Sequence, residues 1–400
     1  MKPFDLNREW NLKRIVELVR THGPISRVEI SEQLHIPQAT VTRAIEDLLK
    51  EKIIKEIGLG QSTGGRRPIL LTFNPACYYV VGVELGRTVV KIALTDIKGE
   101  FLSFRMKETS RNEKIQDVIR YVKDSVLQLL EELQIDRSLL LGVGVGVPGP
   151  LHEDEEGCIS PPDFYGETEI PLQSILNESL DFPVIIDNDA NVAALAEKWF
   201  GKGAGHQNFV YVFADAGVGS GIVVNGNLYR GLHGESGEIG HWTIDLFGER
   251  CTCGNYGCLE TLVSIPKMEE SVRRQLRLAP KSERDLYRVP VDAVSFPDIV
   301  DALKKNSPVA RQVFDEAARY LSVGLSNVIN FFAPELVIVG GRIVQADEKM
   351  PELLRVSTAS RVFGIGGRKV SIAASELREG VVLGAAALVI NNTFAFSAIE

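Results

Sequence analysis

The sequence predicts an α/β protein that has a small helix-turn-helix head and a larger body made of two similar halves. Two observations support this prediction. Residues 1–73 contain three helical hydrophobic repeats followed by two strand-like runs. From residue 74 onward, two segments each begin with the same succession of elements: a strand, a turn and two further strands. This repetition is the pattern of a body with two related α/β halves.

Hydrophobic periodicity and capping residues define the three helices of the head. The first helix has an apolar face and ends at Gly23-Pro24; its face is formed by Leu12, Ile15, Val16, Leu18 and Val19. Ser26 and Glu29 form a capping box, which starts a second helix that runs through Leu34. Pro37 then starts a third helix to about Glu51, whose predicted buried residues are Val41, Ile45, Leu48 and Leu49.

The second and third helices, joined by a tight turn, are typical of a helix-turn-helix whose last helix enters the major groove of DNA. Its first turns carry side chains that can contact bases or phosphates, namely Gln38, Thr40, Thr42 and Arg43. A small helical domain for protein contacts is the alternative interpretation.

A glycine-rich segment, residues 58–68, lies between the strand-like runs 53–57 and 68–73 and predicts the wing of a winged helix. It carries Arg66 and Arg67, which could enter a narrow minor groove. A flexible interdomain linker is the alternative, and both interpretations can hold together. Residues 1–72 have twelve basic and nine acidic residues, whereas the whole chain has a net charge of −9, so only the head suits a polyanion.

The body has buried-type strands and amphipathic helices in alternation. The predicted strands are 79–83, 89–95, 100–104, 139–147, 183–186, 208–213, 221–224 and 336–339, and the predicted helices are 114–134, a helix ending near Phe200, 309–332 and 380–391. The last helix is expected to pack back on the first half. We therefore expect a head at 1–73, a first lobe at 74–187 joined by residues 380–400, and a second lobe at 188–379.

Four metal-binding side chains lie within eighteen residues: His241, Cys251, Cys253 and Cys258. One histidine and three cysteines form a closed tetrahedral set, which predicts one structural Zn²⁺ per chain. Gly254 and Gly257 let the loop turn sharply. The alternative is a group of buried thiols that bind nothing. The other cysteines, Cys77 and Cys158, are expected to be free thiols in a reducing cytoplasm.

The run from Glu238-Ile-Gly-His241 to Cys-Thr-Cys-Gly-Asn-Tyr-Gly-Cys-Leu-Glu260 resembles the signature of the ROK family of repressors, open reading frames and kinases. The head and wing also resemble those of ROK repressors. The resemblance implies a two-lobed, actin-like (RNase H-like) body of the sugar-kinase type, with zinc on the four residues above. It also implies a sugar site, to which we assign Gly149, Asn188, Asp189, Glu238, His241 and Glu260.

In ROK kinases the aspartate that matches Asp189 removes a proton from a sugar hydroxyl. A helix cap is the alternative role for Asn188 or Asp189. The segments that resemble the family's nucleotide-binding loops depart from its pattern. Glu84 replaces an aspartate, Asp215 and Ala216 replace a glycine and a threonine, and Gly340-Gly341-Arg342 replaces three glycines. A negative charge at Asp215 is expected to repel a phosphate.

We therefore expect a sugar-responsive repressor and no enzymatic activity. It would bind palindromic double-stranded operator DNA as a homodimer or a dimer of dimers and respond to a monosaccharide. A sugar kinase with an accessory DNA-binding head is the second interpretation, and a ligand-independent repressor is the third. Xylose, glucose and N-acetylglucosamine all stay open as effectors. No run of eighteen apolar residues exists, so the sequence predicts a cytoplasmic protein without a membrane span.

Overall fold

A computed structural model describes residues 6–61, 67–110, 113–151, 158–159, 164–167, 169–363 and 371–394. Contacts divide the chain into two compact units. The first unit comprises Met1–Gly146, Gln173–Ile186 and Ala385–Glu400, and the second comprises Val147–Leu172 and Asp187–Gly384. This division places residues 147–172 in the second unit, whereas we expected them in the first lobe. It also keeps the head with the first unit. The division into a head and two lobes therefore stays a prediction.

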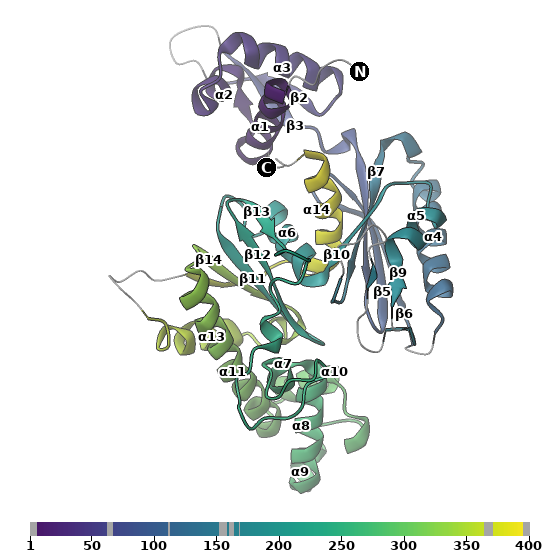
Figure 1. Ribbon diagram of the computed structural model, residues 1–400, viewed down its shortest axis with the longest axis vertical. Helices are drawn as coiled ribbons and strands as arrows, with labels where there is room; N and C mark the ends of the chain where they lie inside the picture. Colours follow the sequence, from purple (N-terminus) through teal and green to yellow (C-terminus); the bar gives the residue numbers. More distant parts are fainter. Residues whose placement is uncertain are drawn as a thin grey trace. The chain divides into compact units, whose positions relative to one another are not determined.

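The head has the predicted three helices and two strands, together with one short strand that the sequence did not indicate (Figure 1). Its elements are α1 Leu6–His22, β1 Ile25–Ser26, α2 Arg27–Leu34, α3 Gln38–Lys50, β2 Ile54–Leu59 and β3 Ile69–Phe73. The three strands form an antiparallel sheet in the order β1-β3-β2. The capping box is present, because Ser26 Oγ accepts from Glu29 N at 3.3 Å and Glu29 Oε2 accepts from Ser26 N at 2.8 Å.

A five-stranded sheet in the order β10-β7-β4-β5-β6 follows the head in the first unit. The elements of this part are η1 Pro75–Cys77, β4 Tyr79–Leu85, β5 Val89–Asp96, β6 Phe101–Glu108, α4 Ile115–Glu132, η2 Arg137–Leu139, β7 Leu140–Val147, α5 Leu172–Ser179, β10 Val184–Asn188 and, from Ala385 onward, α14 Gly380–Phe394. Strands β4, β5 and β6 are antiparallel, and β7 pairs parallel to β4.

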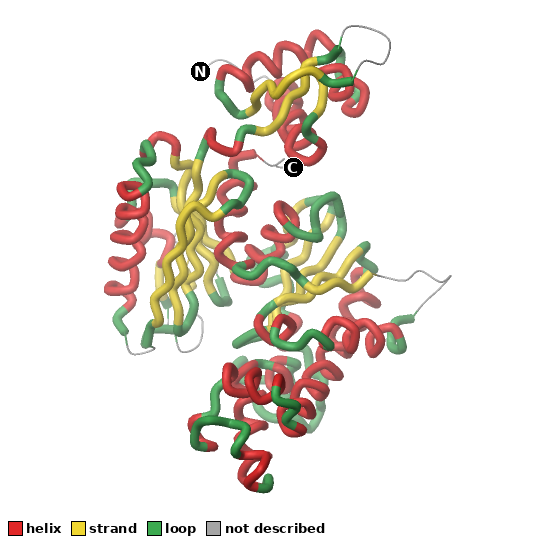
Figure 2. Tube along the Cα trace, turned by 180° about the vertical axis from the view of Figure 1, so that it is seen from behind, coloured by secondary structure: helices red, strands yellow, loops and turns green. Residues whose placement is uncertain are grey.

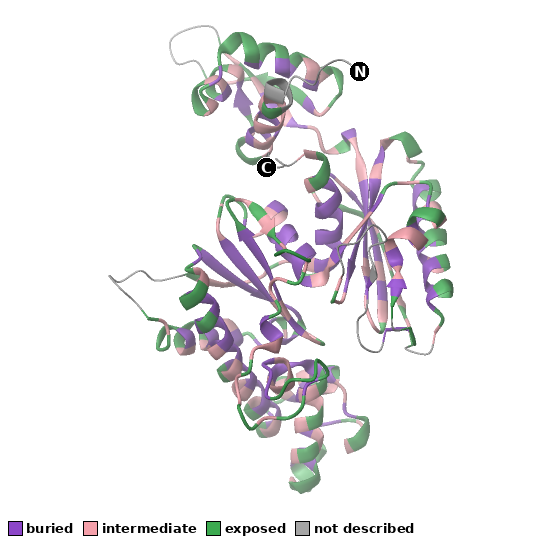
Figure 3. Ribbon diagram, viewed as in Figure 1, coloured by how far each residue is buried: buried purple, intermediate pink, exposed green. Residues whose placement is uncertain are grey.

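The second unit repeats this arrangement in a sheet of order β13-β12-β11-β14-β15, where three antiparallel strands are again followed by a strand parallel to the first. The strands of the sheets are the yellow segments of Figure 2. Its elements are β8 Cys158–Ile159, β9 Ile170–Pro171, α6 Asp189–Phe200, β11 Phe209–Ala214, β12 Val218–Val224, β13 Asn227–Tyr229, η3 Ile239–His241, α7 Glu260–Val263, α8 Ile265–Leu278, α9 Lys281–Arg284, η4 Val291–Ala293, α10 Phe296–Lys304, α11 Pro308–Phe332, β14 Leu336–Gly340, α12 Arg342–Gln345, α13 Met350–Ala359 and β15 Ser371–Ala374. Figure 3 shows that β11 and β14 are buried almost throughout.

The sequence predicts no element between residues 225 and 308 and no strand at residues 371–374, so strand β13, helices α7 to α10 and strand β15 are additions to the prediction. Strand β12 also begins earlier than expected. It starts at Val218 and not at Gly221. A Cβ on Gly221 would lie 2.5 Å from Ala190 O, so this glycine lets α6 pack against the strand. The loop itself is reduced to residues 215–217.

The last helix, α14, packs against the first half as predicted. A Cβ on Gly144 of β7 would lie 1.8 Å from Ala385 O, so only glycine permits this contact. Residues 395–400, which we expected to extend this segment, lie outside the described residues. Among the helices of the described part of the chain, none combines the length and the apolar character needed to span a membrane.

Candidate functional site

The four predicted metal-binding side chains meet in the second unit. Their donor atoms all lie within 4.8 Å of one another. Cys251 Sγ is 3.5 Å from His241 Nδ1, and Cys253 Sγ is 3.8 Å from Cys258 Sγ. Nitrogen and sulfur ligands of one tetrahedral ion, with bonds of about 2.0–2.3 Å, lie about 3.5–3.8 Å apart. The four side chains therefore fit one metal ion.

Two glycines form the turn that brings the sulfur atoms together, as the sequence predicted. Gly254 has φ +94° and Gly257 has φ +62°, which are left-handed conformations that favour glycine. A Cβ on Gly257 would also lie 1.6 Å from Asp245 O. The amide of Cys251 donates to Asn255 O at 2.7 Å and closes the turn.

The imidazole of His241 connects this cluster to a carboxylate. Its Nδ1 faces Cys251, while its Nε2 lies 3.9 Å from Glu238 Oε2. Burial raises the pKa of Glu238; His241 opposes this rise, and the carboxylate of Glu260 adds to it. Glu260 begins α7, and its Oε2 accepts from Val218 N at 3.0 Å. The two predicted sugar-binding carboxylates are thus held beside the metal-binding cluster.

Gly149 and Asn188 meet at the same place. A Cβ on Gly149 would lie 2.6 Å from Asn188 Nδ2 and 3.6 Å from Glu238 Oε1. The structure therefore brings together Gly149, Asn188 and Glu238, three residues that lie far apart in the sequence. Any larger residue at position 149 would enter the space between an amide donor and a carboxylate acceptor.

Asn188 is also the N-cap of α6, so the helix-cap interpretation of this residue is confirmed. Its Oδ1 accepts from Ala190 N at 2.9 Å, and Asp189 Oδ1 accepts from the same amide at 2.8 Å. The cap uses the oxygen of the Asn188 amide, and Nδ2 is the atom nearest to Gly149. Asn188 therefore lies at the end of β10, caps α6 with its Oδ1 and presents its Nδ2 as a hydrogen-bond donor near Gly149.

An ion pair with a buried carboxylate, which the sequence did not predict, supports this turn. Asp187 is 2% exposed, and its Oδ2 accepts from Arg230 Nε at 3.0 Å and from Nη2 at 2.7 Å. Its Oδ1 accepts from Asn188 N and Asn191 Nδ2. The pair fastens the end of β10 to the segment after β13. No local spacing indicated it, because 43 residues separate the partners.

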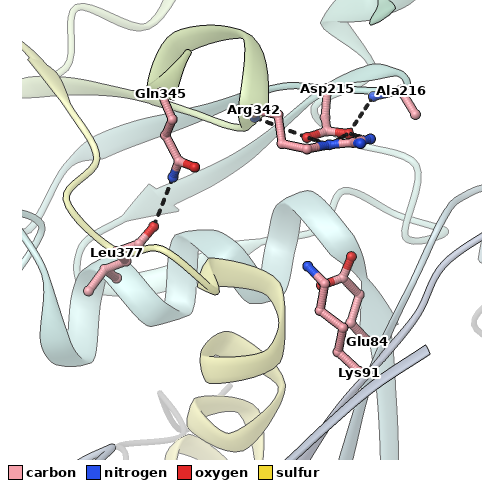
Figure 4. A network of polar contacts seen from close by, with 7 residues as sticks. All are labelled: Glu84, Lys91, Asp215, Ala216, Arg342, Gln345 and Leu377. Carbon is pink, nitrogen blue, oxygen red and sulfur yellow. Dashed lines mark hydrogen bonds and ion pairs between the residues drawn. The ribbon is translucent and has the colours of Figure 1, made fainter. Parts of the chain in front are cut away.

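Glu84 and Asp215 lie in the two segments whose sequences differ from the family's nucleotide-binding pattern. Each of these acids forms an ion pair with a basic side chain of the same chain. In the first unit, Glu84 Oε2 is 3.1 Å from Lys91 Nζ, its cross-strand partner in the β4–β5 pair. In the second unit, Arg342 lies against the carboxylate of Asp215 (Figure 4). The expected repulsion between Asp215 and a phosphate therefore needs correction, because the guanidinium compensates this charge.

The predicted DNA-contacting side chains that the structure describes are all exposed. Gln38, Thr40, Thr42 and Arg43 are all exposed on α3, whose buried residues are Val41, Ala44, Ile45 and Leu48. Leu49, predicted to be buried, is half-buried. Arg67 is exposed, and Arg66 lies outside the described residues.

Comparison with known families identifies both parts of the chain. The model of the ROK family matches residues 80–392. The chain belongs to the ROK family. A second family model, for winged helix-turn-helix DNA-binding domains, matches residues 11–55. This ROK protein therefore joins a DNA-binding head to an actin-like, sugar-kinase-type body, the organisation of a ROK transcriptional regulator.

Relatives with the same organisation cover nearly the whole chain. The xylose repressor of Bacillus subtilis (strain 168) is 32% identical over 388 residues, which are 96% of each chain. The DNA-binding transcriptional dual regulator NagC of Escherichia coli (strain K12) is 29% identical and covers 96% of this chain and 93% of its own. Among curated relatives, then, the similarity extends through head and body together.

Two solved structures show the likeness of the fold. A ROK family transcriptional regulator, described as a homologue of the E. coli MLC protein, has a TM-score of 0.80 at 27% identity and covers 97% of both chains. A ROK glucokinase from Streptomyces griseus, in complex with glucose and AMPPNP, has a TM-score of 0.70 at 27% identity. It covers 78% of this chain and 98% of its own, so its likeness does not include the whole chain.

Proposed function

We propose that this ROK protein is a sugar-responsive transcriptional repressor whose head binds operator DNA and whose body binds a monosaccharide. The observation that carries the proposal is the combination, in one chain, of an exposed α3 surface and a cluster of sugar-type hydrogen-bonding groups. Relatives named as repressors match over 96% of the chain, which supports the same role for head and body.

The chemistry of the cluster suits a neutral polyol. Carboxylates at Glu238 and Glu260 would accept hydrogen bonds from hydroxyl groups, and the Asn188 amide would donate one. Gly149, Asp189 and His241 complete the proposed site. Xylose and N-acetylglucosamine, which appear in the names of relatives, are the first ligands to test.

We further propose that the metal ion is one structural Zn²⁺ per chain, held by His241, Cys251, Cys253 and Cys258. Three sulfurs and one imidazole are a common zinc set, and the observed separations agree with it. Zinc would supply a rigid cross-link for the loop. His241 would then hold its Nε2 in a fixed position toward Glu238, and the loop would hold Glu260 at the start of α7.

The DNA would be palindromic. A single winged helix covers few base pairs, so specificity calls for two heads on one duplex. We therefore propose a homodimer, or a dimer of dimers, on half-sites separated by whole helical turns, roughly 10 bp each. Because its partner is genomic DNA, the protein would act in the cytoplasm. Arg43 would contact a base, and Arg66 and Arg67 would contact the minor groove.

A mobility-shift titration on palindromic and scrambled duplexes tests the proposal. We expect Arg43→Ala to weaken operator binding by about 1–3 kcal/mol and to reduce the preference for the palindrome. Arg120→Ala in α4 changes the charge equally but lies in the body, so it is the control. Added xylose or N-acetylglucosamine should release wild-type protein. Equal binding to both duplexes would contradict the proposal.

A sugar kinase is the second candidate, because a glucokinase with bound nucleotide analogue shares the fold of the body. Asp189 would then take the proton from the sugar hydroxyl. A coupled assay of ATP consumption with a panel of sugars distinguishes the two functions. We expect no sugar-dependent turnover, since the loop acids Glu84 and Asp215 are paired with Lys91 and Arg342.

A further inference from the structure

The carboxylate of Asp215 is bound in the way that a free oxyanion would be bound (Figure 4). Arg342 Nε lies 3.0 Å from Oδ1 and 2.9 Å from Oδ2, and Nη2 also donates to Oδ1. The backbone amide of Arg342 donates to Oδ2 at 3.0 Å, and the amide of Ala216 donates to Oδ1 at 2.7 Å. A guanidinium group and two amides thus converge on one pair of oxygens.

The backbone next to these donors makes hydrogen bonds that do not involve the carboxylate, and Arg342 O also accepts from Ala346 N at 3.0 Å. Asp215 N donates to Gly217 O at 2.9 Å, and Asp215 O accepts from Ile265 N at 2.9 Å. Strands β11 and β14 are parallel up to the pair Phe213 and Gly340. The segments that follow them, which contain Ala216 and Arg342, therefore start from the same edge of one sheet. The donors would therefore stay close together without the aspartate side chain.

Gly341 makes the close approach of Arg342 possible. Its φ is +96°, and a Cβ at this position would lie 2.2 Å from Ala214 O. Only glycine can adopt this conformation so near the end of β11 without strain. The contact joins residues that are 127 positions apart, whereas the pair Arg355–Glu352 lies within one helix turn. The architecture of the sheet, not local helix spacing, creates the Asp215 contact.

The donor set matches phosphate chemistry. A planar guanidinium binds two oxygens of a phosphate or carboxylate side by side, and backbone amides add neutral donors. The side chain of Asp215 is 13% exposed and that of Arg342 is 57% exposed. The carboxylate therefore occupies the inner position, and the guanidinium stays accessible from solvent.

We propose that Asp215 is a built-in anion that fills an oxyanion site formed by Arg342 and the amides of residues 216 and 342. A phosphate group cannot bind there while the tethered carboxylate is present, because the carboxylate is always at high local concentration. Removing the carboxylate opens a site for inorganic phosphate. The inference rests on the proposed function, since a working kinase would need this loop open for its nucleotide.

Calorimetric titration of the full chain with inorganic phosphate tests the proposal. We expect Asp215→Ala to bind phosphate at least about tenfold more tightly than wild type, equivalent to about 1.4 kcal/mol. Asp292→Ala is the matched control, because it removes an equal charge from an exposed pair with Arg277. The double variant Asp215→Ala/Arg342→Ala should lose the gain. Asp215→Gly, which restores the glycine of the family pattern and also empties the site, replaces the alanine variant if that variant does not fold.

Three results would overturn the inference: no gain in the folded Asp215 variant, the same gain in Asp292→Ala, or full retention of the gain after Arg342 is removed. Each leaves the proposed repressor function standing if wild type still binds operator and consumes no ATP with sugar. Conversely, sugar-dependent ATP consumption by wild type would overturn the proposed function itself, whatever the phosphate titration of the variant shows.

Discussion

Two groups of acidic side chains in the second unit have different partners. Glu238 and Glu260 lie beside an imidazole and a backbone amide, whereas Asp215 is bound by a guanidinium group. A carboxylate that already has an internal cation has little to offer a ligand. A carboxylate that is not held by a guanidinium group can still accept hydrogen bonds from hydroxyl groups. Under the proposed function, the second unit would bind sugar at Glu238 and Glu260, while the tethered carboxylate of Asp215 would close the proposed phosphate site.

Burial adds a second contrast, between the Arg230–Asp187 pair and the Arg342–Asp215 pair. We expect Arg230→Ala to lower the free energy of unfolding by about 3–5 kcal/mol, because it leaves the buried Asp187 charge uncompensated. Arg342→Ala, at a more exposed pair, should cost about 1 kcal/mol or less. Urea unfolding followed by tryptophan fluorescence measures both. Equal losses would show that burial does not separate the two pairs.

The metal-binding cluster should decide how well the two glutamates are held. We expect Cys251→Ser to lose its metal and to bind sugar roughly tenfold or more weakly. Elemental analysis and calorimetric sugar titration measure these effects. Cys77→Ser is the control, since Cys77 is a buried thiol in the first unit. Unchanged sugar affinity in a metal-free protein would separate the cluster from the sugar site.

Gly149 tests the assembly of the proposed sugar site most directly. A methyl group there would lie 2.6 Å from Asn188 Nδ2, so Gly149→Ala should reduce sugar affinity about tenfold, or about 1.4 kcal/mol. The thermal unfolding midpoint should change little. Gly380→Ala is the control, because the nearest atom to its added methyl would be 4.0 Å away. Loss of sugar binding in both variants would argue against a specific site at Gly149.

The capping box of the head is expected to give a small change in stability. Here the partner of the acidic side chain is a hydroxyl group together with a backbone amide. Glu29 is held by the Ser26 hydroxyl and amide, which lower its pKa below the ordinary value of 4.5. A lowered pKa stabilises the fold above the unfolded value, and this contribution is lost as the pH falls through the folded value. Ser26→Ala should cost about 1 kcal/mol at neutral pH and should reduce this acid sensitivity.

Thermal unfolding monitored by circular dichroism between about pH 3 and 7 checks the Ser26 prediction against the pKa window of Glu29. Ser360→Ala is the control, since Ser360 is an exposed residue whose hydroxyl bonds only the nearby Ser357 carbonyl among the interactions described. If both variants have the same pH dependence, the capping box does not contribute to the acid sensitivity of the head.

The sequence by itself determined the parts of this protein that depend on short-range order. Apolar spacing and the Ser26–Glu29 capping box predicted the head helices, because the groups involved are one or two helical turns apart. The metal-binding cluster was predictable for the same reason. Its four side chains span eighteen residues, and Gly254 and Gly257 mark the turns that bring them together.

Only the tertiary structure decided the partners of the acids. Arg230 reaches Asp187 across 43 residues, and Arg342 reaches Asp215 across 127. It also showed that Gly221 is a packing position in a strand and that Gly149 faces Asn188. Such contacts follow from strand order and from how closely two backbones approach. Local spacing does not encode these properties, since they arise only when distant segments share one sheet.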